Sequence, residues 1–171
     1  MKIASSIKYA LLGACLVIAT KLTVFLTHSQ FTTLGRYSGV FALAFLSIPL
    51  VLAIINRRDT ELKGFIALKE VMRTGLFVCV IASMIVALFN YIYFRFIDHE
   101  ILAYWLVESE RSLRELKGSE EEIKKAQDYL TDFYSPSSQA MGSLTGVLGV
   151  GAVLAFILSA FLVKNPPSAE N

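Results

Sequence analysis

The stretch GLFVCVIASMIVALFNYIYFRFI, residues 75–97, decides the fold class of this chain. It carries a single charged residue, Arg95, close to its end. A helix rises ~1.5 Å per residue, so a stretch of this length crosses a hydrocarbon core of ~30 Å. Lipid offers no hydrogen bonds to exposed backbone groups, and an uninterrupted apolar run favours a helix over a barrel strand. The stretch therefore predicts a transmembrane helix.

Three further apolar runs of similar length flank it, and together they predict spans at about 7–27, 37–55, 75–97 and 140–163. Of the 171 residues, 55% are hydrophobic and 18% are charged. Soluble domains have about 25% charged residues. The sequence predicts an all-α integral membrane four-helix bundle. It forms a single membrane domain over residues 1–171, with an outer helical insertion at 98–136 and a C-terminal tail at 164–171.

Composition also argues against several classes of protein. No basic cluster stands out from the residues that flank the spans, so we expect no nucleic-acid partner. Cys15 and Cys79 lie inside predicted spans without a CxxC spacing, which indicates small packing residues. LLGAC, residues 11–15, is similar to a lipoprotein cleavage box, but the apolar run continues to Leu26. We therefore expect a retained first span.

Basic residues predict the orientation of the bundle. The connection between spans two and three carries five of them: Arg57, Arg58, Lys63, Lys69 and Arg73. The connection HSQFTTLGR, residues 28–36, carries only Arg36 beside His28. Lysine and arginine in short connections favour the cytoplasmic side. Both termini are then expected in the cytoplasm, and the insertion at 98–136 outside it.

The insertion carries ten acidic and five basic residues and has the pattern of two amphipathic helices. The first covers about 101–116, with an apolar stripe of Leu102, Trp105, Leu106, Leu113 and Leu116. Ser119 and Glu122 have the spacing of a capping box at the start of the second helix. That helix places Ile123, Ala126, Leu130 and Phe133 on one face. We expect a helical hairpin that lies as a cap on the outer ends of the spans, covered by lipid, the bundle or a partner.

Four segments together resemble a known family. They are GFIALKEVMRTG (64–75), NYIYFRFID (90–98), GSEEEIKKAQDYLTDFYSP (118–136) and a last span rich in small residues that ends at Lys164. The combination is similar to the bacterial four-span membrane proteins catalogued as domain of unknown function forty-one ninety-nine. His99 departs from the resemblance, since the family pattern has a proline there. The resemblance implies a four-helix fold in the bacterial inner membrane and no activity, cofactor or catalytic residue.

The titratable side chains do not form a recognisable catalytic motif. His28 and His99 are the only histidines, and both are expected at the outer ends of spans. They are weak candidates for a metal site or a pH sensor, and ordinary interfacial histidines are the alternative. We expect no cofactor and no enzymatic activity.

Lys21 lies about six residues inside the first predicted span, and no predicted span contains Asp or Glu. A buried carboxylate is common in proton-coupled carriers, so its absence argues against that mechanism. Lys21 either snorkels or pairs with Asp98 or Glu100, or it contacts an anionic group such as a lipid headgroup.

Small residues line the last span: Gly142, Gly146, Gly149, Gly151, Ala155 and Ser159. Such residues let helix backbones approach closely in lipid. They predict packing either inside the bundle or against a homo-oligomer or partner span. The leading functional hypothesis is a non-enzymatic accessory or scaffold subunit that acts through helix packing and the outer hairpin. The alternative is a small transporter or lipid-handling membrane protein.

Overall fold

The computed structural model describes residues 3–98 and 100–164. The helices in chain order are α1 (Ile3–Leu26), α2 (Thr33–Asn56), the π-helical turn η1 (Arg57–Glu61), α3 (Leu68–Ile92), the π-helical turn η2 (Tyr93–Ile97), α4 (Glu100–Glu115), α5 (Glu120–Phe133) and α6 (Pro136–Leu162). The described residues form no named strand. The predicted all-α fold is confirmed.

Four helical stretches are long and apolar enough to cross a membrane: Ala4–Leu26, Tyr37–Glu61, Leu68–Ile97 and Pro136–Leu162. They correspond to the four predicted spans, with earlier starts for the first, third and fourth and a later end for the second. Pro136 occupies the first turn of α6, where its missing N–H costs no helical hydrogen bond. The Ser135 side chain accepts the Ser138 backbone N–H at 3.2 Å and so caps this helix. Proline thus marks the start of the last span as well as the end of the hairpin.

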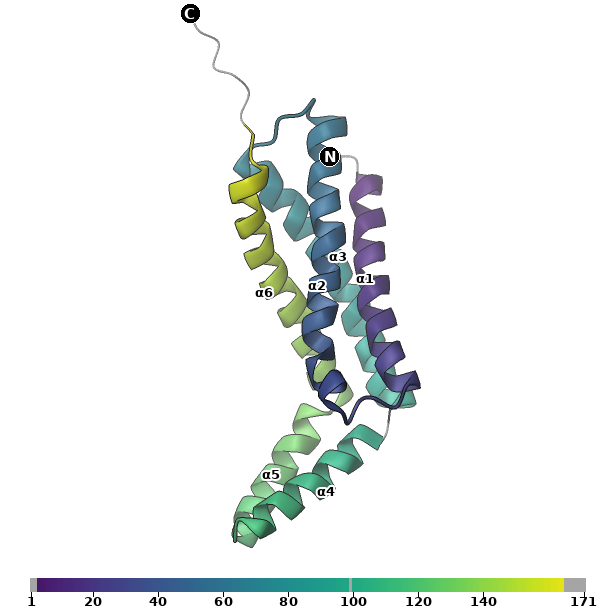
Figure 1. The fold of residues 1–171 in the computed structure, drawn as a ribbon, viewed down its shortest axis with the longest axis vertical. Coiled ribbons are helices and arrows are strands. Elements are labelled where there is room, and N and C mark those ends of the chain that lie inside the picture. Colours follow the sequence, from purple (N-terminus) through teal and green to yellow (C-terminus); the bar gives the residue numbers. More distant parts are fainter. Residues whose placement is uncertain (1–2, 99, 165–171) are drawn as a thin grey trace, which may run out of the picture.

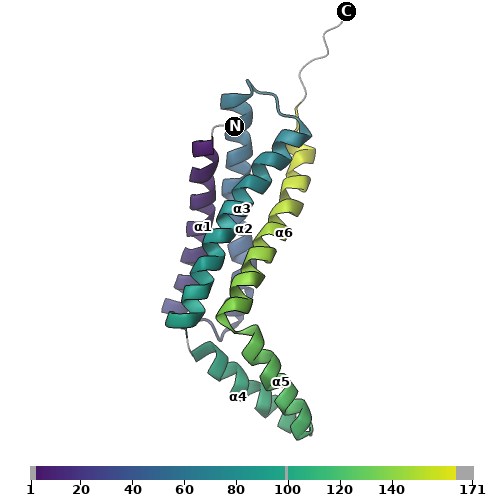
Figure 2. The same ribbon diagram turned by 180° about the vertical axis from the view of Figure 1, so that it is seen from behind.

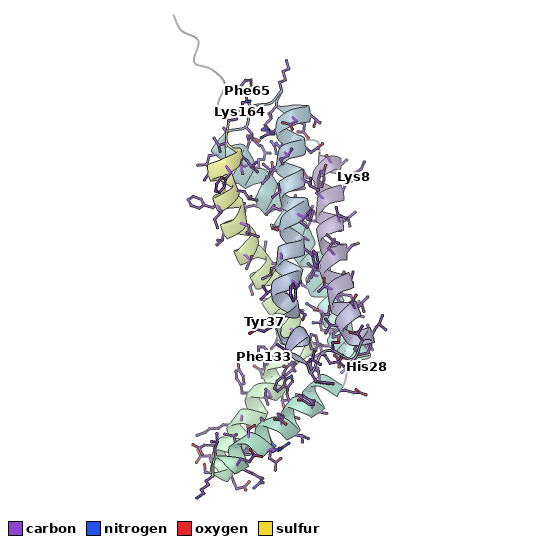
Figure 3. The ribbon with its side chains drawn as sticks, in the orientation of Figure 1. Lys8, His28, Tyr37, Phe65, Phe133 and Lys164 are labelled. Carbon is purple, nitrogen blue, oxygen red and sulfur yellow. The ribbon has the colours of Figure 1, made fainter. Side chains whose placement is uncertain are left out.

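α3 is the central helix of the bundle and packs against α1, α2 and α6 (Figures 1 and 2). The described chain begins and ends on the same side, which we call the terminal end (Figure 1). There Ile66 and Lys164 exchange two backbone hydrogen bonds of 2.9 and 3.0 Å. The Lys164 ammonium lies 5.8 Å from the centroid of the Phe65 ring (Figure 3). These contacts fasten the end of α6 to the connection before α3.

The predicted stripe of small residues divides into two faces. Gly151, Ala155 and Ser159 are buried, and a Cβ added to Gly151 would overlap the side chain of Cys79 on α3. Ala155 makes the same close approach to Gly75, where an added Cβ would lie 2.7 Å from the Ala155 Cβ. An added Cβ would meet nothing within 4 Å at any of the three other glycines, Gly142, Gly146 and Gly149. The first set packs inside the bundle, and the second faces outward.

A buried arginine pairs with a partly exposed glutamate at the terminal end. Arg57, in η1, is 5% exposed and forms an ion pair with Glu70 at the start of α3. Its Nη1 also donates a hydrogen bond of 2.9 Å to Thr74 Oγ1. The arginine predicted to set orientation therefore also links α2 to α3.

The insertion at 98–136 forms a hairpin of α4 and α5 that projects from the end of the bundle opposite the termini, here called the hairpin end (Figures 1 and 2). The prediction that it lies as a cap over the spans is wrong. The stripe residues Leu102, Trp105, Leu106 and Leu113 of α4 are half-buried, and Ile123 of α5 is buried. α4 and α5 pack against each other and cover these residues, whereas the stripe residues Leu116 and Phe133 are exposed, contrary to the prediction.

Candidate functional site

Asp98 sets the direction in which the hairpin leaves the bundle. It ends η2 and is 2% exposed. The Tyr93 hydroxyl donates to Asp98 Oδ2 at 2.7 Å, and the Ile101 backbone N–H donates to Oδ1 at 3.2 Å. The second bond satisfies a free backbone donor at the start of α4. Because both carboxylate oxygens are bonded, Asp98 joins the third span to α4 firmly.

Lys21 lies beside this junction, roughly 8 Å along α1 from its end at Leu26. Its ammonium lies 4.1 Å from the centroid of the Phe94 ring and 4.7 Å from that of the Tyr93 ring. Aromatic faces attract a cation, more strongly where water is excluded. Lys21 therefore points into the bundle, onto the rings of η2.

A cavity of about 450 Å³ lies between α1, α2, α3 and α6 at the level of Lys21. Its polar lining comes from Thr20, Lys21, Ser38, Asn90 and Ser143, and most of the remaining lining is aliphatic. The Asn90 amide donates to the Ser143 hydroxyl across the α3–α6 contact, and that hydroxyl donates to Gln139 O at 2.7 Å. Asn90 therefore links α3 to α6 through a side-chain hydrogen bond.

The hairpin carries a second candidate site on the exposed face of α5. The rings of Tyr129 and Phe133 stack with centroids 5.9 Å apart, and the two residues are 66% and 46% exposed. Asp128 and Asp132 lie beside them, exposed, and neither has an ion-pair partner among the described residues. We call these four residues the acidic aromatic patch.

Polar contacts hold the two hairpin helices in register. Arg114 Nη1 of α4 binds Glu120 Oε1 of α5 at 2.9 Å, and Gln127 Nε2 donates to Glu110 Oε2 at 3.3 Å. Near the bundle, burial raises the pKa of the Tyr134 phenol above its ordinary value. A hydrogen bond with Trp105 offsets part of this rise. The hairpin is thus held together from its tip to its base.

The predicted capping box at Ser119 and Glu122 is present. The Ser119 backbone N–H donates to Glu122 Oε2 at 2.7 Å, and the Glu122 N–H donates to Ser119 Oγ at 3.3 Å. Two hydrogen bonds hold the pKa of the Glu122 carboxyl below its ordinary value. The bond from the Ser119 backbone has the larger effect and that from the Ser119 hydroxyl the smaller. These residues act on helix structure.

The two histidines are not brought into a described site. His28 ends the first span in a left-handed conformation, with φ +50°, and is exposed (Figure 3). His99 lies outside the described residues. No group of three His, Cys, Asp or Glu side chains with the arrangement of a metal site occurs among residues 3–98 and 100–164.

Sequence reasoning missed two of the polar groupings. Asp98 was named as one possible ionic partner of Lys21, but its hydrogen bonds to Tyr93 and the α4 backbone were not anticipated. Glu70 lay in the basic connection without an assigned role, although it pairs with Arg57. A carboxylate one helical turn before the apolar run of α3 was the available signal for that pair.

The family comparison agrees with this architecture. The model of a family described as "Protein of unknown function (DUF4199)" matches residues 8–164, which include all four spans and the hairpin. Neither the curated proteins nor the solved structures contain a match to this chain. Since the match extends over most of its length, the chain belongs to the DUF4199 family, whose function is unknown.

Proposed function

We propose that this protein is a non-enzymatic accessory or scaffold subunit whose hairpin binds a membrane-protein partner with a basic surface. The observation that carries the proposal is the acidic aromatic patch on a hairpin whose two helices pack against each other. Asp128 and Asp132 add unpaired negative charge beside two exposed rings. Charge complementarity favours encounter with a basic partner and discriminates against acidic ones. Aromatic side chains are enriched at the centres of interfaces.

If the patch binds a basic partner, reversing the charge of its two aspartates should abolish that binding. In the Asp128→Lys/Asp132→Lys variant, recovery of a stoichiometric partner from native membranes in mild detergent should fall about tenfold or more, because like charges then oppose each other. Mass spectrometry of the pulled-down material measures this recovery. The matched control is Arg111→Gln/Glu115→Gln, which removes an exposed ion pair of 3.1 Å on α4 without changing the net charge.

Replacing residues 100–133 by a short Gly–Ser linker provides a stronger version of the test. The rings of Phe94 and Tyr134, one on each side of the replaced segment, have centroids 6.2 Å apart, so the two flanking parts of the chain lie close together. Partner recovery should be abolished while membrane insertion is retained. Equal recovery with and without the hairpin would rule out this role.

We also propose that the protein lies in the bacterial inner membrane with both termini in the cytoplasm and the hairpin outside. The basic residues at the terminal end, among them Lys63 and Lys164, support this orientation. Lys63 and Lys117 form a matched pair for a labelling test, since both are exposed turn residues with φ of +53° and +57°.

The expected result in intact cells is labelling of Lys117→Cys by a membrane-impermeant maleimide and protection of Lys63→Cys until the membrane is permeabilised. Both variants are made in a Cys15→Ala/Cys79→Ala background, which removes the two native thiols. The opposite pattern of labelling would reverse the orientation.

A further inference from the structure

Lys21 has unused hydrogen-bonding capacity at a depth where such capacity is costly. Its ammonium contacts two aromatic rings, yet it donates no hydrogen bond to any described residue. Asp98, whose negative charge acts on Lys21, already accepts hydrogen bonds on both oxygens. An ammonium has three donors and a full charge. The charge of Lys21 is therefore only partly compensated within the chain.

The cavity beside Lys21 contains a second unmet polar group. Asn90 is 7% exposed, and its Oδ1 has no hydrogen-bond partner among residues 3–98 and 100–164. The hydroxyls of Thr20 and Ser38 donate to backbone carbonyls of their own helices, at 2.8 and 2.7 Å, which leaves their oxygens free to accept. Buried polar groups are normally paired, so this grouping indicates a missing polar ligand.

The cavity opens to the side of the bundle between α2 and α6. Gly39 and Val40 of α2 and Gly146 of α6 line it and are exposed. In a bundle that crosses a membrane, a lateral opening between two spans faces lipid. A second apolar hollow of about 440 Å³ between α1 and α2 shares Thr20 and Ser38 with the first. Acyl chains can therefore lie on the apolar lining of either hollow, one on each side of Thr20 and Ser38.

We propose that this cavity binds the anionic group of a membrane amphiphile, with its phosphate or carboxylate oxygens on Lys21 and its chain among the aliphatic residues of α2 and α6. Charge complementarity selects an anionic group, and the lateral opening selects a molecule that reaches the site from the bilayer. A diacyl phospholipid and a free fatty acid share this chemistry. The site is separate from the acidic aromatic patch and does not depend on the accessory role.

Native mass spectrometry of the full-length protein in mild detergent tests the proposal. The probes are phosphatidylglycerol, palmitate and, as an uncharged comparison, diacylglycerol with the same chains as the phospholipid. Wild type should bind at least one anionic probe about tenfold or more tightly than diacylglycerol, because charged hydrogen bonds are among the stronger polar contacts. Preference for phosphatidylglycerol would identify a phospholipid site, and preference for palmitate a fatty-acid site.

Lys21→Met should weaken binding of the preferred anion about tenfold or more, with retained binding in Lys21→Arg. A second pair of variants leaves the lysine in place. Gly146→Phe fills the cavity from α6, whereas Gly149→Phe adds the same ring at a glycine that does not line it. Binding should be lost in the first and kept in the second.

Three results would overturn the proposal: equal binding of diacylglycerol and both anions, wild-type affinity in Lys21→Met, or indistinguishable binding by the Gly146→Phe and Gly149→Phe proteins. If Lys21→Met does not fold, the glycine pair decides the question alone.

Discussion

Replacing Glu70 with alanine is expected to destabilise the protein by about 3–5 kcal/mol, because the change leaves a buried guanidinium without its counter-charge. Arg57 is 5% exposed, and its Nε already lacks a hydrogen-bond partner in the part of the chain that the structure describes. Without Glu70, the bond of 2.9 Å to Thr74 is the side-chain hydrogen bond left to Arg57 among the described residues. The midpoint of unfolding in a detergent titration with sodium dodecyl sulfate measures the loss.

Two controls separate the buried charge from the lost contact. The double variant Arg57→Met/Glu70→Leu removes both charges and should recover most of the stability, since an apolar pair of similar volume commonly replaces a buried ion pair without loss. Glu115→Gln removes one partner of the exposed pair with Arg111 and should leave the midpoint unchanged. If Glu70→Ala also unfolds at the wild-type midpoint, Arg57 reaches water or headgroups and the pair does not hold α2 to α3.

The spans and the hairpin helices follow from local sequence patterns. Each span is a continuous apolar run, and lipid makes helix the available structure for such a run. The start of α5 is equally local, because Ser119 and Glu122 satisfy each other's backbone donors within one turn. Such features depend on residues only a few positions apart, so a single sequence contains them.

The direction of the hairpin does not follow from local patterns. The apolar stripes on α4 and α5 show that one face of each helix must be buried. They do not show whether the two stripes pack against each other or against the ends of the spans. The direction of the hairpin depends on Asp98, which accepts hydrogen bonds from the Tyr93 hydroxyl in η2 and from the Ile101 backbone N–H in α4. These bonds fix the angle between α3 and α4, and sequence spacing does not give that angle.

The candidate cavity could not be predicted from the sequence either. Lys21, Asn90 and Ser143 come from three helices, and their approach depends on how those helices cross. Lys21 was recognisable from the sequence as a cation at membrane depth, whereas the space beside it was not. The sequence thus identified one residue of the site, and the packing of the spans supplied the rest.

Gly151→Ala is expected to destabilise the bundle by about 1–3 kcal/mol, the range for overpacking a closely packed interior. The new methyl group would overlap the Cys79 sulfur and lie 2.9 Å from the Cys79 Cβ, so α6 must move away from α3. Helices in lipid associate through such close packing, because burying apolar surface inside a bundle gains little free energy when that surface already faces lipid. The same detergent titration measures the change.

Gly149→Ala is the matched control, two residues earlier on the same helix. A Cβ there meets nothing within 4 Å, so the variant should be neutral or more stable, by up to about 1 kcal/mol from helix propensity. The double variant Gly151→Ala/Cys79→Ala removes the sulfur and should recover part of the loss, which assigns the effect to this contact. Equal midpoints for Gly151→Ala and Gly149→Ala would contradict the close α3–α6 packing. A loss at Gly149 in native membranes but not in detergent would instead place a second helix against the outward face of α6.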